Sequence, residues 1–190
     1  MILNIGANDP KNKILWDEET AVQGGSFTLA DVLPSVAMYV LKGVALAVNH
    51  TSRVCNIVKT GLVVTGSTTT ATRVAKNELF KVGDVISKVV GGAAVAITAI
   101  DYSNDGYNVL SHLTNGGAFS ADDVIFEAAA VGASSAYKYT ANGLLNDNTK
   151  NAGSLTMTRV AFALGIQELN LPYPVSAAIK TALTSRYEFV

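Results

Sequence analysis

Short segments in which apolar and polar side chains alternate are separated by turn-forming residues along most of the chain from residue 34 to residue 132. An alternation with a period of two places successive side chains on opposite faces, which is the pattern of a β-strand. Turn-forming residues recur roughly every 8–15 residues over this stretch, a spacing typical of all-β sandwiches and barrels. The pattern therefore predicts a mainly β protein, built as a small antiparallel β-barrel or sandwich.

The central stretch, Lys76–Asp101, shows this organisation most clearly. We predict that it forms a strand around Phe80, a tight turn, a second strand, a loop at Gly91-Gly92 and a third strand. Gly83 supplies the positive φ that the tight turn requires. The side chain of Asp84 is expected to accept a backbone hydrogen bond within this turn.

Residues 1–33 differ from the rest of the chain because they lack a sustained strand period. Their few large apolar residues include the candidate interface residues Ile14, Leu15 and Trp16. Such residues dock either onto the protein's own domain or onto a partner, and the sequence does not separate the two alternatives. We therefore divide the chain into an N-terminal arm, residues 1–33, which serves attachment or oligomerisation, and a β-rich domain, residues 34–190.

The end of the chain contains its best amphipathic helix, between residues 175 and 186. Apolar residues recur there at the spacing of one helical face, namely Val175, Ala178, Ile179, Ala182 and Leu183. Before the helix, residues 153–166 alternate as a single strand. The predicted fold class is thus mainly β, a small antiparallel β-barrel or sandwich with an extended N-terminal arm and a short C-terminal helix.

Charge is scarce, and this limits the possible partners. Charged residues make up 15% of the chain and hydrophobic residues 49%, with a formal net charge of −1. A surface so poor in charge can be buried against other protein at a low desolvation cost. We expect no nucleic-acid partner, which would require a basic patch. We expect no membrane partner either, because no stretch approaches the roughly 20 apolar residues of a membrane span.

Residue patterns typical of catalysis or metal binding are also missing. The one cysteine, Cys55, is predicted to be a buried structural residue on the apolar face of a strand, which fits cytosolic synthesis. The two histidines, His50 and His112, lack the spacings of metal-ligand motifs. We find no phosphate-binding loop and no serine-nucleophile motif. We therefore predict no catalytic, cofactor-binding or metal-binding residue, no cofactor and no enzymatic activity.

Several segments resemble a known family. They are Lys42-Gly43-Val44-Ala45-Leu46-Ala47, then Val74–Ile86 with its Val82-Gly83-Asp84 turn, then Ile97–Asp101, and finally Leu171–Val190. These segments resemble head fibre and auxiliary capsid (decoration) proteins of tailed bacteriophages, particularly those that infect Bacteroidota. The second segment departs from the family pattern at Leu79-Phe80. The resemblance implies an extended N-terminal segment, a small β-domain, and a structural protein bound to the outside of the major capsid shell.

The resemblance also implies partners and a location. The major capsid protein would be the partner, the chain would form a homo-oligomer with a trimer favoured, and residues 1–33 would attach it to the shell. The protein would be made in the host bacterial cytoplasm and placed on the outer surface of the virion. A second class, a carbohydrate-binding or host-surface-binding β-module on the virion, stays open. Such a module requires exposed aromatic platforms, for which the candidates are Tyr102, Tyr107, Tyr137 and Tyr139.

Overall fold

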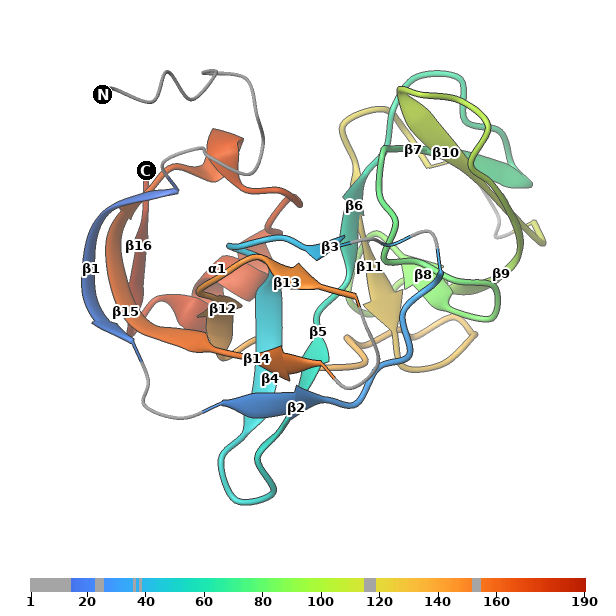
Figure 1. Cartoon of the computed structure of the whole chain (residues 1–190). Coiled ribbons are helices and arrows are strands. Elements are labelled where there is room, and N and C mark those ends of the chain that lie inside the picture. Colours follow the sequence, from blue (N-terminus) through green and yellow to red (C-terminus); the bar gives the residue numbers. More distant parts are fainter. Residues whose placement is uncertain (1–14, 23–25, 36, 38, 115–118, 152–154) are drawn as a thin grey trace, which may run out of the picture. The chain divides into compact units, whose positions relative to one another are not determined.

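A computed structural model of the chain (Figure 1) describes residues 15–22, 26–35, 37, 39–114, 119–151 and 155–190. It is mainly β with a short α-helix near the C-terminus, which confirms the predicted fold class. The chain forms two compact units. Unit 1 comprises the described residues within 1–30, 38–57 and 141–190, and unit 2 comprises those within 31–37 and 58–140.

Unit 2 is built on a six-stranded sheet that closes on itself. Its strand order is β6-β11-β8-β9-β10-β7, and a bridge between Val63, which follows β6, and Val74 of β7 joins the two ends. Closure removes the free edges through which open sheets pair with other chains. The strands are β6 (Thr60–Leu62), β7 (Ala71–Ala75), β8 (Val85–Ser87), β9 (Val95–Asp101), β10 (Tyr107–His112) and β11 (Val124–Ala128).

The interior of this barrel is filled by alternate residues of its strands. In β10, for example, Asn108, Leu110 and His112 are buried, and the residues between them are only partly buried. This is the period of two expected of a strand with one face on a core. The main apolar cluster comprises Val63, Val74, Phe80, Ile86, Val95, Ile97, Leu110, Phe119 and Ile125.

Unit 1 is built on an eight-stranded sheet that nearly closes. Its order is β1-β15-β12-β4-β5-β2-β14, with β16 paired to β15. Only Thr158 separates β14, the last strand in this order, from β15, the second strand. The two ends of the sheet are therefore connected by a single residue. The strands are β1 (Trp16–Val22), β2 (Phe27–Leu29), β4 (Ala45–Asn49), β5 (Val54–Ile57), β12 (Gly143–Leu145), β14 (Thr156–Met157), β15 (Arg159–Ile166) and β16 (Tyr187–Phe189).

A second, smaller sheet belongs to unit 1. Strands β3 (Tyr39–Val40) and β13 (Thr149–Lys150) pair as a separate two-stranded sheet.

Two pairs in the large sheet, β2 with β5 and β15 with β16, are parallel, whereas the sequence predicted antiparallel pairing. A parallel pair requires a longer connection than a hairpin, and at least 20 residues separate the strands in each of these pairs.

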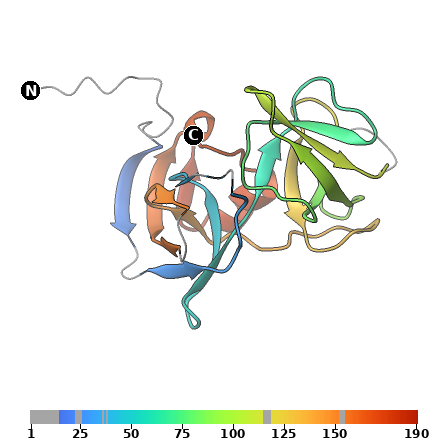
Figure 2. The same ribbon diagram turned by 45° about the vertical axis from the view of Figure 1, so that its right-hand side comes forward.

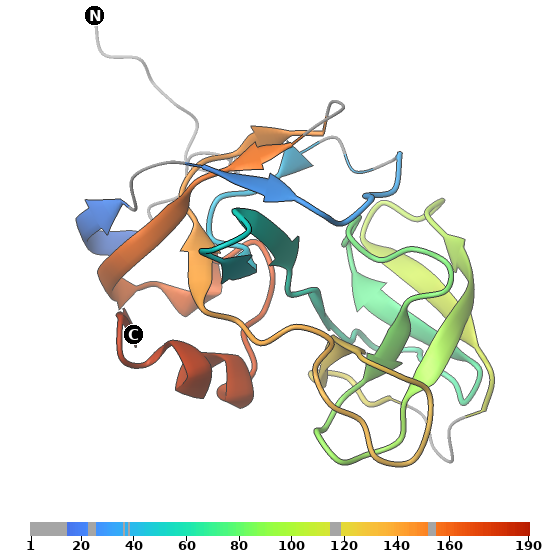
Figure 3. The same ribbon diagram turned by 90° about the horizontal axis from the view of Figure 1, so that it is seen from below.

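The predicted C-terminal helix is present as α1 (Ala177–Leu183), drawn in red in Figure 3. The Ser176 hydroxyl caps it by accepting a hydrogen bond of 3.2 Å from the backbone N–H of Ile179. Of the predicted apolar face, Ile179 and Leu183, one turn apart, are buried in unit 1. Ala178 and Ala182 are exposed, and Val175 precedes the helix. A short 3-10 helix, η2 (Glu168–Asn170), precedes α1.

The structure corrects the first part of the predicted central stretch. Residues around Phe80 form no strand, although Phe80 itself is buried in the core. The backbone N–H groups of Leu79 and Lys81 donate to the side chains of Asn77 and Asp84, at 3.0 Å each. Such local bonds satisfy the backbone without a neighbouring strand. The turn that follows is confirmed, since Gly83 has a φ of 92°.

The predicted arm is not separate from the rest of the chain. Strand β1 pairs with β15 (Figure 2), and β2 pairs with both β5 and β14. Strand pairing depends on backbone hydrogen bonds, so it does not require an alternating side-chain pattern. The predicted boundary between residues 33 and 34 therefore does not coincide with a division between compact units, and residues 34–190 belong to both.

Candidate interaction surface

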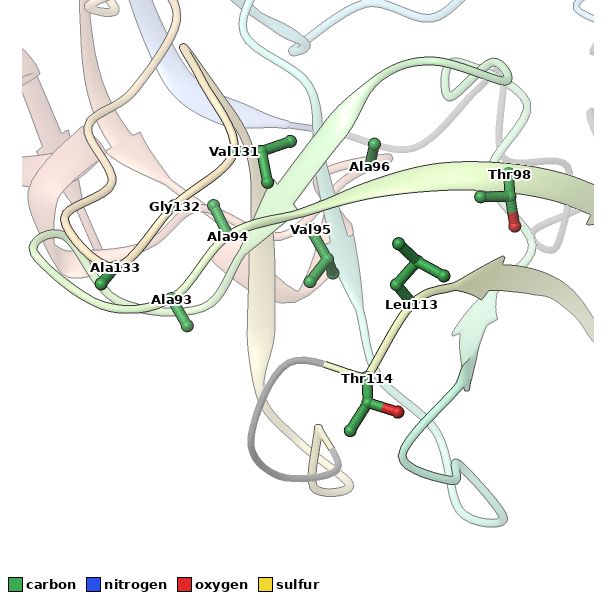
Figure 4. A pocket seen from close by; sticks show the side chains of 10 residues that line it. All are labelled: Ala93, Ala94, Val95, Ala96, Thr98, Leu113, Thr114, Val131, Gly132 and Ala133. Atoms are coloured by element: carbon green, nitrogen blue, oxygen red, sulfur yellow. The ribbon is translucent and has the colours of Figure 1, made fainter.

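An uncharged groove of about 440 Å³ lies on unit 2 (Figure 4). Three segments line it: β9 with the residues just before it, the two residues after β10, and the loop after β11. None of the described lining residues carries a charge, and all but two of them, both threonines, have no polar side-chain group. They are Ala93, Ala94, Val95, Ala96, Thr98, Leu113, Thr114, Val131, Gly132 and Ala133.

The groove has a buried floor and an exposed apolar rim. Val95 forms part of the floor; it is buried and belongs to the main core cluster of the barrel. Leu113 and Val131, by contrast, are 75% and 61% exposed. Large apolar side chains grouped around a hollow are typical of surfaces that a partner covers.

The loops beside the groove extend this apolar surface. The loop that precedes β9 carries Val89 and Val90, which are 56% and 53% exposed. Backbone hydrogen bonds hold this loop against the loop after β11: Gly91 donates to Ser135 at 2.7 Å, and Ser135 donates to Gly92 at 3.0 Å. The exposed valines of the two loops are thus held on neighbouring segments of one unit.

The predicted interface residues do not form this surface. Leu15 is 5% exposed, and a methyl group of its side chain lies next to Gly43, so Leu15 belongs to the core of unit 1. The backbone of Trp16 begins β1, and its side chain lies outside the described part of the structure, as does Ile14. Of the two alternatives left open by the sequence, Leu15 therefore follows the first, docking onto its own domain.

The four candidate tyrosines are all half-buried and engaged within unit 2. Tyr102 donates a hydrogen bond of 3.1 Å to the Phe80 carbonyl, and Tyr137 stacks on Phe126 with 3.9 Å between ring centroids. The guanidinium of Arg73 lies 4.9 Å from the ring of Tyr107, and the ammonium of Lys138 lies 5.4 Å from that of Tyr139. These contacts indicate packing roles and not an aromatic platform for a sugar.

Residues with metal-binding or nucleophilic side chains are dispersed. Cys55 is fully buried, with its sulfur 4.0 Å from the Phe27 carbonyl, which confirms its predicted burial. His112 is buried in unit 2, where Nε2 lies 2.8 Å from the Thr72 hydroxyl. Within the described ranges, no group of three or more His, Cys, Asp or Glu residues is placed to hold a metal ion. In the same ranges, no helix is long and apolar enough to cross a membrane.

A second, smaller hollow of about 250 Å³ lies on unit 1 and is polar and cationic. His50, Asn142, Arg186 and Tyr187 are among its lining residues. Partial desolvation, together with the positive charges of Arg159, Arg186 and Arg53, lowers the pKa of His50. The described lining residues of this hollow include the Ser185 hydroxyl but no carboxylate.

Sequence reasoning missed the groove because period and composition do not reveal which apolar residues stay exposed. Leu113 directly follows β10 in a polar stretch, and Val131 lies three residues after the end of β11 in a stretch of small residues. An apolar residue in a polar turn was the signal that could have marked Leu113. Comparisons of the chain with protein-family models, with curated proteins and with solved structures found no match.

Proposed function

We propose that this protein is a structural component of a bacteriophage virion, a head fibre or decoration protein bound to the outside of the major capsid shell. The observation that carries the proposal is the uncharged groove on unit 2, with Leu113 and Val131 exposed at its rim. A surface of this kind loses little by desolvation and gains by removing apolar area from water. The resemblance of Lys42–Ala47, Val74–Ile86 and Ile97–Asp101 to phage head proteins indicates the kind of partner.

The proposal includes assembly into a homo-oligomer, with a trimer favoured. The closed barrel of unit 2 offers no strand edge for pairing, so contacts between copies through this unit would use side-chain surfaces such as the rim of the groove. Native mass spectrometry at micromolar concentration tests this part. A trimer mass supports it, and the mass of a single chain contradicts it.

The alternative, a carbohydrate-binding or host-surface-binding module on the virion, has less support. It requires aromatic rings that are free to stack on a sugar, and the four candidate tyrosines are half-buried and already engaged. Binding to a panel of bacterial surface glycans would favour this alternative over capsid attachment.

Co-sedimentation with capsids made of the phage's major capsid protein tests attachment directly. We expect the wild-type protein to sediment with the capsids, and Val131→Asp to reduce the bound fraction at least about tenfold, because it places a charge on an apolar contact. Val82→Asp is the matched control, since Val82 is 59% exposed in the same unit and does not line the groove. Both variants should keep the far-UV circular dichroism of the wild type. Equal binding by all three proteins would contradict the proposal.

A further inference from the structure

The side chains of Lys59, Asp84 and Glu127 meet inside unit 2, in or directly before three neighbouring strands. Lys59 comes directly before β6, Asp84 directly before β8, and Glu127 lies in β11, which pairs with both of these strands. Side chains two residues apart on a strand share a face. Glu127 therefore faces the same way as Ile125, and Asp84 the same way as Ile86; both isoleucines belong to the core cluster of the barrel.

The three groups are close together and almost completely removed from solvent. The Lys59 Nζ lies 2.7 Å from Oδ2 of Asp84 and 3.5 Å from Oε2 of Glu127. The side chain of Lys59 is fully buried, and those of the two acids are each 2% exposed. On the solvent side, Lys138 donates a hydrogen bond of 2.6 Å to the other oxygen, Oε1, of Glu127. An amine and two carboxyl groups thus share one dry site.

This site is poorly explained as a stabilising element of the fold. Burial of an ion pair costs desolvation free energy, and apolar residues of similar volume stabilise a core as well or better. Oε2 of Glu127, moreover, is buried without a hydrogen-bond partner although it points at the Lys59 amine. Desolvation raises the pKa of Glu127 and so favours its protonated form. A buried acid held next to an amine and a second carboxyl group is an arrangement suited to proton transfer.

We propose that Lys59 and Asp84 condense into an intramolecular amide bond, with Glu127 as the catalytic proton carrier. A proton first moves from the Lys59 ammonium to the Asp84 carboxylate, which leaves a neutral amine and a neutral acid. The lone pair of Nζ then attacks Cγ of Asp84 and forms the new C–N bond. Glu127 takes a proton from the nitrogen and returns one to the departing hydroxyl group. The C–O bond breaks, one water molecule leaves, and no oxidant or other reactant is required.

The geometry favours Asp84 over Glu127 as the acid that reacts. Oδ2 of Asp84 is nearer to the amine, and it also accepts a hydrogen bond of 3.0 Å from the backbone N–H of Lys81. This hydrogen bond holds the Asp84 carboxyl group in place beside the amine that attacks it. Glu127 lies farther from the amine, within reach of a proton on Nζ.

The environment supplies a driving force for the reaction. The reaction replaces a buried ammonium and a buried carboxylate by an uncharged amide, and a low-dielectric site favours the uncharged product. Fixed neighbours in a suitable geometry react as though at very high concentration, with effective molarities of roughly 10⁵–10⁸ M. The bond would tie the chain before β6 to the turn before β8, across the strand that lies between them in the barrel. This inference does not depend on a role in a virion.

Intact-mass spectrometry of the purified, denatured full chain tests the proposal. We expect the wild-type chain to be lighter than its sequence by the mass of one water molecule, and digestion followed by fragmentation should place the bond between Lys59 and Asp84. The unmodified sequence mass in protein that has been incubated folded would overturn the proposal. So would a water loss mapped to Asp105-Gly106, where an aspartyl succinimide has the same mass, or a bond to Glu127 in place of Asp84.

Variants separate the reaction from folding. Lys59→Arg keeps the charge but offers no reactive amine, and it should have the full sequence mass. Glu127→Gln keeps the size of the side chain but not its proton chemistry, and it should slow bond formation at least about a hundredfold. Lys88→Arg is the matched control, because Lys88 pairs with Asp123 on the surface of the same unit and does not contact the three groups, and it should lose water as the wild type does. A Glu127→Gln protein that folds and forms the bond at the wild-type rate would overturn the role of Glu127.

Discussion

Among the described residues, each of the two units buries one lysine or arginine side chain, and the two are held very differently. Arg159 of unit 1 is 4% exposed, and its Nη1 donates a hydrogen bond of 2.9 Å to the backbone carbonyl of Asn142. Lys59 of unit 2 lies between the buried carboxyl groups of Asp84 and Glu127. Arginine keeps its proton in proteins, whereas a desolvated lysine can lose one and become a nucleophile. The comparison indicates a structural cation in unit 1 and a reactive cation in unit 2.

The largest effect should come from Lys59→Met. This change removes the Lys59 amine, and with it the proposed amide bond, and it leaves buried acid without its partner, so we expect a loss of at least about 3–5 kcal/mol in the free energy of unfolding. Urea denaturation followed by circular dichroism measures it. Lys88→Met is the control, because Lys88 pairs with Asp123 on the surface, and exposed pairs contribute less than about 1 kcal/mol. Equal losses in the two variants would contradict the assignment of Lys59 as the centre of a buried charge cluster.

Arg159→Met should have a smaller effect. The substitution removes the hydrogen-bond donor of the Asn142 carbonyl, which is a neutral group. It breaks no ion pair among the described residues, so we expect a cost of about 1–3 kcal/mol. The methionine can replace the stem of Arg159, which packs on Gly143. Urea denaturation measures this cost. Arg186→Met is the control, because Arg186 is an exposed arginine of the same unit, and the difference between the two variants reports the effect of burial. A loss as large as that of Lys59→Met would remove the distinction between the two cations.

The pH dependence of stability should also distinguish the units. Burial is the main cause of the raised pKa of Glu127; Asp84 raises that pKa further, and Lys59 and Lys138 oppose the rise. The folded protein therefore binds this proton more tightly than the unfolded chain, and stability falls as the pH rises from about 4.5, the ordinary value, through the folded-state pKa. Unfolding free energies measured across this range should show the fall in wild type and in Arg159→Met, and its absence in Glu127→Gln. A slope that survives in Glu127→Gln would assign it to another group.

The same contrast explains what the sequence could and could not predict. Local signals were sufficient for α1, for the buried Cys55 and for the turn at Gly83, because each depends on residues close together in the chain. Closure of the two sheets depends on pairs such as β1 with β15 and β6 with β11, which are far apart in sequence. A strand at a sheet edge, such as β1, needs no alternating pattern, and its assignment to an arm was wrong for that reason.

The charged site of unit 2 was out of reach for a related reason. Lys59 and Asp84 are 25 positions apart, and no motif spacing connects either to Glu127. Asp84 was predicted as a turn residue that accepts a backbone hydrogen bond, and it does so with the N–H of Lys81. Its second role, as the partner of a buried lysine, follows only from the order β6-β11-β8. Sequence spacing therefore identified the turn at Gly83-Asp84 but not the buried cluster of Lys59, Asp84 and Glu127.

The smallest effect should come from the turn itself. Gly83 has a φ of 92°, and a Cβ placed there would meet no atom within 4 Å, so Gly83→Ala introduces backbone strain without a clash. We expect a cost of about 1 kcal/mol in urea denaturation. Gly143→Ala offers the contrast, because its Cβ would overlap the stem of buried Arg159, and overpacking of this kind costs about 1–3 kcal/mol. If Gly83→Ala also prevents the loss of water from the chain, then the turn positions Asp84 for reaction with Lys59. A Gly83→Ala variant less stable than Gly143→Ala would show that the turn bears more strain than its backbone geometry indicates.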